Sequence, residues 1–417
     1  MLGLGAPHDD LVAAACRPFV PAARSAGPLD TGAEARGREA LPRGACAPLL
    51  YTTGALLRST DRSEDPDQSV TPPRLAVLSI GSCGPCRYAL FESAWQRALQ
   101  TEGRAPVRVV GPGQSGEALH AWLGTALGGQ LLDAVAAADA LVLARNRALP
   151  RATRAAAIER AFKRATDGVA SAIAGGVSPL VALGTVRGWE RAVPVASGRT
   201  IARVRLLGDP WSLHTNGDGQ LRVPSVLAPL GVEVAVPPSL LWARYSIWLA
   251  RGAPWGAEIA VTAEESAALA ALDARIVAAW NAACAALDLD DGELPDPEWL
   301  AMLAAPFLPP TLRGGYGHME VGLARDAVLA GDAHALVSVK SFGCMPSSGV
   351  SDALINAATE GALPFLALEV CADGHAARES RLALLAAEAL LRARRDPTQR
   401  LAEPSVQHPS SILDQIP

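Results

Sequence analysis

The sequence predicts an α/β protein with two or more Rossmann-like parallel-sheet domains that carry helices on both faces. Short apolar segments bounded by Gly or Pro alternate with longer segments of helical spacing, the order expected of parallel strands joined by helices. The chain has 417 residues, more than one hydrophobic core usually serves. Half of the residues are hydrophobic. Each domain can therefore bury a core of its own.

Residues 1–73 are predicted to form a lead-in to the first domain. Asp9–Cys16 and Leu49–Arg58 each have the spacing of an amphipathic helix. The polar segment Ser59–Pro73 contains three prolines. Because proline interrupts regular structure, we expect a surface loop there.

A first α/β domain is predicted over residues 74–200. Leu75–Ile80 suits a buried parallel strand, Arg87–Gln100 has helical spacing, and Val107–Val110 returns as a strand. This order predicts a βαβ unit. A further strand is expected at Asp139–Leu143 because the segment is short and almost wholly apolar.

A second α/β region is predicted over residues 201–395. Its expected strands are Val204–Gly208, Val232–Val236, Ala335–Val339 and Phe365–Val370. Its expected helices are a short one within Leu221–Leu230, residues 263–288, one that begins near Ser351, and Ala376–Arg394. Thr262 followed by Glu265 is the sequence of a capping box. The tail, residues 396–417, is rich in Pro, Gln and Ser and is expected to be disordered.

Charge and hydropathy argue against nucleic-acid and membrane partners. The net charge of −5 gives no general attraction to phosphate backbones, and the basic stretch Arg145–Arg164 reads as a solvated helix face. Charged residues, Pro or Gly interrupt the apolar stretches before the roughly 18 residues that argue for a bilayer span. Asp9 and Asp10 stand where a signal peptide would be basic or apolar. We therefore expect a cytoplasmic protein.

Seven cysteines in a reducing compartment suggest metal ligands, redox thiols or small core residues. Cys83 and Cys86 enclose Gly-Pro, directly after a predicted strand and before a predicted helix. Backbone amides there can point at the sulfurs, and a helix N-terminus favours thiolate. The same four residues also occur in thioredoxin active sites, so a metal site and a redox pair both remain open.

Cys344 and Cys46 occupy similar positions. Cys344 follows a predicted strand, and Cys46 precedes a predicted helix. Because ligands gather at the carboxyl ends of parallel strands, Cys344 and Cys86 can converge there. Thiolates from separate loops suit an iron-sulfur site. The remaining cysteines lie in or beside apolar helix or strand segments and are expected in the core: Cys16, Cys284 and Cys371.

Lys340 and His318 are candidates for polar roles at the same cavity, and no catalytic residue is assigned. Lysine occurs at only two positions, Lys163 and Lys340. A lysine two residues before Phe342 suggests that a compact ammonium group is needed near the cysteines.

Together these segments resemble the family of 2-hydroxyacyl-CoA dehydratases and benzoyl-CoA reductases, and the region that follows the activase in fused activator proteins. The matching segments are the opening helix His8–Phe19, Cys-x-Pro and Thr-Thr-Gly within Cys46–Gly54, Cys-Gly-Pro-Cys-Arg within Ser82–Tyr88, Phe-Gly-Cys-Met-Pro-Ser from Phe342, and Glu369, Asp373, Gly374, Ser380 and Arg381. The sequence departs from the family at Gly44-Ala45, Asp209-Pro210-Trp211, Gly317–Glu320 and Ser341.

The resemblance implies a [4Fe-4S] or related iron-sulfur cluster with Cys46, Cys86 and Cys344 as ligands and Cys83 as a further candidate. It implies low-potential one-electron transfer in the dehydration or reduction of CoA thioesters. The implied partners are a separate ATP-hydrolysing activase, a related second subunit and an acyl-CoA substrate. Two alternatives remain open: a non-catalytic partner or scaffold that binds the cluster, and a thiol-disulfide oxidoreductase that uses Cys83 and Cys86.

Overall fold

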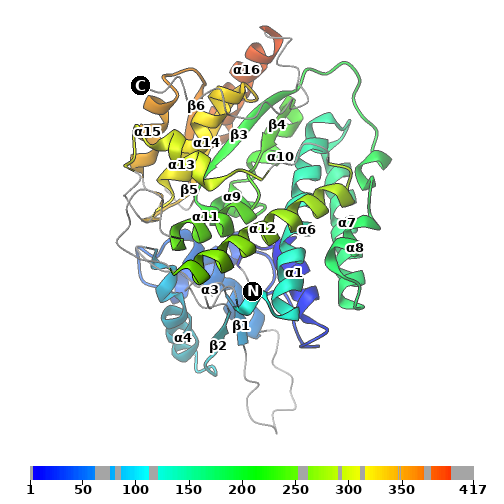
Figure 1. Cartoon of the computed structure of the whole chain (residues 1–417), viewed down its shortest axis with the longest axis vertical. Coiled ribbons are helices and arrows are strands. Elements are labelled where there is room, and N and C mark those ends of the chain that lie inside the picture. The colour runs from blue at the N-terminus through cyan, green and yellow to red at the C-terminus, as the bar shows by residue number, and fades with distance from the viewer. Residues whose placement is uncertain are drawn as a thin grey trace.

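Helices surround two parallel sheets, as Figure 1 shows. The computed structural model describes residues 3–61, 76–79, 86–111, 121–251, 262–289, 294–309, 315–345, 347, 349–370 and 377–395. Within these residues the named strands form a two-stranded and a four-stranded sheet, and all their pairings are parallel. The α/β class predicted from the sequence is therefore confirmed.

The small sheet is the predicted βαβ unit. β1 (Ala76–Leu78) pairs with β2 (Arg108–Val110), and between them the chain forms η1 (Arg87–Leu90) and α4 (Phe91–Thr101). A small apolar core joins this unit to the lead-in helix α3 (Ala47–Asp61). The side chains of that core are Cys46, Leu56, Leu57, Val77, Phe91, Trp95, Leu99 and Val107. The first cysteine segment is therefore packed onto the first βαβ unit.

The large sheet contains all four strands predicted after residue 200. They are β3 (Ala202–Gly208), β4 (Val232–Ala235), β5 (Ala335–Ser341) and β6 (Phe365–Val370). The strand order is β4-β3-β5-β6, so the chain adds β4 on one side of β3 and β5 and β6 on the other. In open parallel sheets, ligands bind beyond the carboxyl ends of the strands at such a reversal. Here the reversal lies between β3 and β5.

Most of the described residues are helical. The longer helices are α1 (His8–Cys16), α2 (Thr31–Ala40), α6 (Ala126–Ala148), α7 (Ala155–Ala174), α11 (Leu240–Ala250), α12 (Ala263–Ala286), α14 (Gly317–Ala330), α15 (Gly349–Ala358) and α16 (Arg378–Arg395). The shorter ones are α8 (Pro179–Gly184), α9 (Pro210–His214), α10 (Val223–Leu227), α13 (Pro297–Ala304), η2 (Leu149–Arg151), η3 (Trp189–Ala192), η4 (Asp218–Gln220) and η5 (Ala228–Leu230). One cluster of buried apolar side chains joins α1, α6, α12 and α16 to the large sheet.

Several predicted helices are confirmed, among them α1, α3, α10, α12, α15 and α16. The capping box of α12 is present. The backbone N–H of Glu265 donates to Thr262 Oγ1 at 3.1 Å, and the N–H of Thr262 donates to Glu265 Oε2 at 2.9 Å. These bonds satisfy two of the N–H groups that a helix start leaves without a partner inside the helix.

The predicted strand at Asp139–Leu143 is wrong, because this segment lies inside α6. A short apolar run has the same periodicity in a buried helix as in a buried strand. Alanine favours helix. Because α6 is buried on several sides, its sequence there is an almost unbroken run of apolar residues. Asp139 is buried and accepts hydrogen bonds from His8 Nε2 at 2.8 Å and Ser239 Oγ at 2.9 Å. It thereby joins α6 to α1 and to the start of α11.

The helix α2 is not predicted from the sequence. Its N-cap is Asp30, whose side chain accepts the backbone N–H of Ala33 at 2.9 Å. The helix packs closely on α3, because a Cβ built on Gly37 would lie 2.0 Å from the carbonyl oxygen of Leu50. A Cβ on Gly54 would lie 1.8 Å from the carbonyl oxygen of Ala33. Glycine at these two points lets the helix backbones touch.

The predicted loop Ser59–Pro73 differs from the structure at its start, where residues 59–61 continue α3. The rest of the predicted loop, residues 62–73, lies outside the described residues, and so does the tail, residues 396–417. Among the residues that the structure describes, Ala126–Arg151 and Ala263–Ala286 are long and apolar enough to cross a membrane, with 56% and 39% of their most apolar windows buried. A core helix of a soluble protein also meets that criterion.

Candidate functional site

The segments that carry Cys46, Cys86 and Cys344 meet between the small sheet and the large one. Gly343 has a φ of +74°, and a Cβ built there would lie 3.8 Å from both Cα and Cβ of Cys46. Arg87 Nη1 donates a hydrogen bond of 3.0 Å to the carbonyl oxygen of Gly44. These contacts bring together three segments that are distant in the sequence.

Each of these cysteines accepts a hydrogen bond from a backbone N–H that follows it. The N–H of Tyr88 donates to Cys86 Sγ at 3.4 Å. In the same way the N–H of Leu49 donates to Cys46 and that of Ser347 donates to Cys344. Backbone donors of this kind stabilise negative charge on sulfur. The prediction that backbone amides point at the sulfurs of Cys83 and Cys86 is therefore confirmed for Cys86, and Cys46 and Cys344 show the same arrangement.

Burial works against thiolate formation at this place. It is the largest cause of a raised pKa at Cys46 and at Cys344, where the pKa lies well above its usual range. The negative charges of Cys86 and Asp209 raise the pKa of both thiols further. Cys86 therefore lies within electrostatic reach of the other two cysteines. Without a compensating cation, Cys46 and Cys344 are neutral thiols at pH 7.

Asp209 forms part of this site and was not predicted as a functional residue. It follows β3 directly and is 2% exposed. Its carboxylate accepts the backbone N–H of Ser341 at 2.7 Å and that of Ser212 at 3.0 Å. Burial raises the pKa of Asp209 while these donors lower it. The sequence signal was its position, at a strand end and before the proline that opens α9.

Tyr316 is a second site residue that the sequence did not reveal. Its hydroxyl donates a hydrogen bond to Cys86, and burial together with the charges of Cys86, Cys344 and Asp209 raises its pKa well above the usual value. Its ring packs edge-on against Trp242, with centroids 5.1 Å apart. The phenol thus presents a neutral donor to the cysteines. No motif surrounds Tyr316 that could have identified it.

Lys340 lies near Cys344, as the sequence suggested, but in a closed environment. It is 2% exposed, with Nζ 3.1 Å from Glu320 Oε2 and 2.7 Å from Asp352 Oδ1. Nζ also lies 2.5 Å from Ser351 Oγ. Because these partners surround the ammonium group, it is not presented to a substrate in this conformation.

His318 is buried on α14 among apolar groups. Its Nε2 lies 3.2 Å from the carbonyl oxygen of Pro309, and its ring centroid lies 6.3 Å from that of Trp248. Burial lowers the pKa of His318, so the imidazole is neutral at pH 7. Among the residues described, these contacts do not include the cysteines.

The other cysteines are only partly described. Cys16 ends α1, half-buried, and Cys284 is buried in α12, in agreement with the expected core positions. Cys83 and Cys371 lie outside the described residues. The structure therefore leaves the role of Cys83 as a prediction.

The donor set suits a soft metal centre. Thiolates are the ligands of iron-sulfur clusters, and Cys46, Cys86 and Cys344 offer thiols from three separate segments. In the described part of the chain, no three His, Cys, Asp or Glu side chains form a group that could hold a single metal ion. Cys46, Cys86 and Cys344 are the residues that would hold a cluster, with Cys83 as the remaining candidate.

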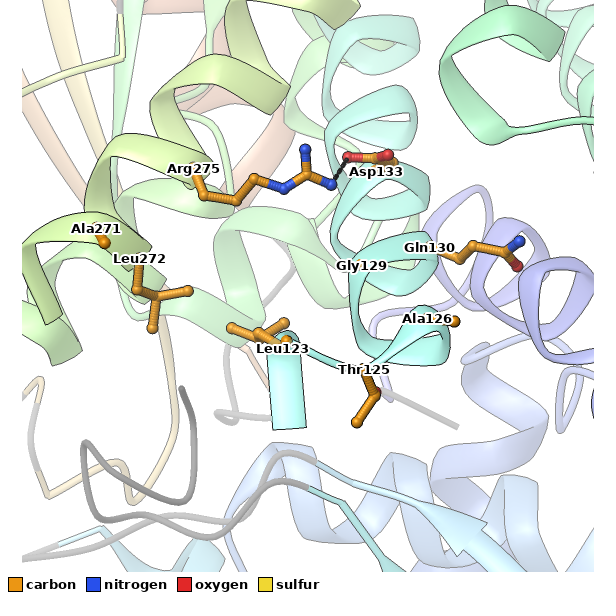
Figure 2. A pocket seen from close by; sticks show the side chains of 10 residues that line it. Leu123, Thr125, Ala126, Gly129, Gln130, Asp133, Ala271, Leu272 and Arg275 are labelled. Carbon is orange, nitrogen blue, oxygen red and sulfur yellow. Dashed lines mark hydrogen bonds and ion pairs between the residues drawn. The ribbon is translucent and has the colours of Figure 1, made fainter. Parts of the chain in front are cut away.

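A groove of about 520 Å³ lies elsewhere in the molecule, between the start of α6 and α12. Figure 2 shows Thr125 and Gln130 on one side and Leu272 on the other, with Arg275 reaching across to Asp133 at 3.2 Å. None of its lining residues is a predicted site residue. The groove is therefore separate from the cysteine site.

Comparison with known proteins adds no assignment. No family model, curated protein or solved structure matches the chain.

Proposed function

We propose that this chain is an iron-sulfur protein that resembles components of 2-hydroxyacyl-CoA dehydratases and acts in low-potential one-electron transfer. The observation that carries the proposal is that the segments of Cys46, Cys86 and Cys344 lie in contact and that each cysteine accepts a backbone N–H. Backbone N–H donors and burial are the features by which proteins hold such clusters and tune their potentials. In the proposal these three cysteines, with Cys83 as a fourth candidate, are the ligands.

Burial raises the pKa of Cys46 and Cys344, so a metal centre would have to supply the positive charge that lets both thiols ionise. Two thiols beside the buried carboxylate of Asp209 lose their protons only at high cost when no positive charge is near. A metal centre removes this cost, because thiols that bind metal are deprotonated. Asp209 and Tyr316 would then lie beside the sulfurs, with the phenol donating to Cys86.

The fold is consistent with the proposed Rossmann-like domains. The order β4-β3-β5-β6 is that of an open, doubly wound sheet, and Asp209 and Cys344 follow the two strands at its reversal. A cluster held by Cys46, Cys86 and Cys344 would supply low-potential one-electron chemistry toward a CoA thioester. A separate ATP-hydrolysing activase is the proposed donor, a related second subunit completes the assembly, and the compartment is the cytoplasm.

Anaerobic purification with iron and acid-labile sulfide analysis tests the proposal. The wild-type protein should be brown and contain stoichiometric iron and sulfide, and Cys344→Ala should lose both. Cys16→Ala is the matched control, because it removes a half-buried thiol at the end of α1, and it should keep the iron.

A colourless wild-type protein after anaerobic reconstitution would contradict the proposal. If that iron-free protein showed a two-electron dithiol titration that depends on Cys83 and Cys86, the thiol-disulfide alternative would take its place. Iron that persists in Cys344→Ala would remove Cys344 from the ligand set.

A further inference from the structure

A buried group of charged and hydroxyl side chains stands beside Cys344. Glu320 on α14 is 1% exposed. Its two carboxylate oxygens accept hydrogen bonds from different parts of the chain. Oε1 accepts a hydrogen bond from Ser347 Oγ, and Oε2 accepts one from Ser351 Oγ. Oε2 also lies 3.1 Å from Lys340 Nζ. One carboxylate thus connects β5, the segment after Cys344 and the start of α15.

Ser347 forms the link between this group and the cysteine. Its backbone N–H donates to Cys344, and its hydroxyl donates to Glu320. The other side of the segment is also fixed, because the N–H of Cys344 donates to the carbonyl oxygen of Ser341 at 2.9 Å. The position of the Cys344 sulfur therefore depends on a chain of contacts that ends at Glu320.

The charges around Glu320 favour a positioning role. Lys340 lies between Glu320 and Asp352, and both carboxylates are within 3.1 Å of its ammonium group. Buried ion pairs contribute little net stability, because desolvation offsets most of their attraction, whereas they can specify one arrangement of the chain. Here the arrangement specified is that of the segment between β5 and α15, which contains Cys344.

We propose that Glu320 is a positioning residue for Cys344 and acts through the Ser347 hydroxyl to hold the thiol toward Cys46 and Cys86. Lys340 Nζ, 3.1 Å from Glu320 Oε2, orients the carboxylate. The role of Cys344 as a ligand rests on the proposed function, but the position of its thiol does not. The two ideas can therefore be tested separately.

The test is the alkylation rate of Cys344 in reduced, metal-free protein treated with iodoacetamide, followed by mass spectrometry of the cysteine peptides. Ser347→Ala removes the hydroxyl and leaves the backbone N–H in place. We expect Cys344 to react about tenfold faster, because a hydrogen bond to a charged acceptor restrains local opening by about that factor or more. Cys86 in the same sample should keep its rate.

Two further variants make the result specific. Ser347→Thr keeps the hydroxyl and should restore the wild-type rate at Cys344. Ser338→Ala is the matched control, because Ser338 is a fully buried serine on β5 whose hydroxyl makes no hydrogen bond among the described residues. In Ser338→Ala, Cys344 should be alkylated at the wild-type rate.

Equal rates in wild type and Ser347→Ala would overturn the inference, as would an equal acceleration in Ser338→Ala. Glu320→Gln serves as a second variant and should also speed the reaction. If the wild type binds no iron but Ser347→Ala shows the faster alkylation, the proposed function fails and the positioning role stands. If the wild type binds iron and Ser347→Ala matches its alkylation rate, the positioning role fails alone.

Discussion

Asp209 and Ser341 join the two central strands at the candidate site. The carboxylate that follows β3 accepts the backbone N–H at the end of β5 over 2.7 Å, in a fully buried environment. This bond satisfies a donor that would otherwise lack a partner at the end of the strand. It also fixes the starting point of the segment that contains Cys344.

Asp209→Asn should lower the free energy of unfolding by about 1–3 kcal/mol. Asparagine keeps one carbonyl oxygen, so an amide NH₂ must face one of the two backbone donors, Ser212 or Ser341. Urea unfolding measures the loss. Asp296→Asn is the control: Asp296 is an exposed N-cap that accepts the N–H of Glu298 at 3.0 Å, and asparagine caps as well as aspartate. Equal effects of the two substitutions would contradict the prediction.

Lys340→Met should destabilise the protein by about 3–5 kcal/mol, because it leaves the buried carboxylate of Glu320 and the partly buried one of Asp352 without a cation. Lys163→Met is a control from the only other lysine, which forms an exposed pair with Asp167 at 2.6 Å. Such pairs contribute about 0.3–0.5 kcal/mol. Chemical denaturation of both variants gives the comparison. A small loss in Lys340→Met would show that the ion pair is not buried in solution.

His214 should make stability fall as the solution becomes acidic. Burial lowers its pKa to about 3, with the charge of His8 acting in the same direction and that of Asp139 opposing it. Because the unfolded imidazole has a pKa near 6.5, the unfolded state takes up the proton first as the pH falls. The contribution of the neutral His214 to the free energy of unfolding is therefore complete above about pH 6.5 and is lost progressively as the pH falls toward about 3.

The corresponding variant is His214→Gln, which removes the titrating group. Between pH 7 and pH 5 the wild type should lose about 2 kcal/mol more stability than the variant. Between pH 7 and pH 8 the two proteins should change in parallel. Denaturant unfolding at the three pH values measures the difference. Parallel curves down to pH 5 would show that His214 accepts a proton in the folded state.

Gly54→Ala should force α2 away from α3. The new methyl carbon would lie 1.8 Å from the carbonyl oxygen of Ala33, and overpacking of this kind costs about 1–3 kcal/mol or more. Gly184→Ala is the control, because it also adds a methyl group to a helical glycine but meets nothing within 4 Å. Thermal unfolding should show a lower midpoint for Gly54→Ala only. An unchanged midpoint would mean that the two helices are not in contact.

The sequence alone determined the large sheet, the βαβ unit and the capped helix α12. Strands such as Val204–Gly208 are short apolar runs bounded by turn residues, and the Thr262 capping box is a local signal. Hydrophobic periodicity failed to distinguish helix from strand where an element is buried on all sides, because almost every position is then apolar. The segment Asp139–Leu143 is apolar in either state, and only the packing of α6 among other helices shows that it is helical.

For the candidate site, the sequence identified Cys46, Cys86 and Cys344 because each stands at a junction between a strand or loop and a helix. Asp209 offered only its position at a strand end as a signal, and no local signal pointed to Tyr316 or Glu320. Their importance depends on which distant segments they touch, such as Asp209 on Ser341 and Glu320 on Ser347. Those contacts follow from the strand order and from packing between elements, which no local stretch of sequence encodes. Sequence thus set the chemical groups, and the tertiary structure decided which of them meet.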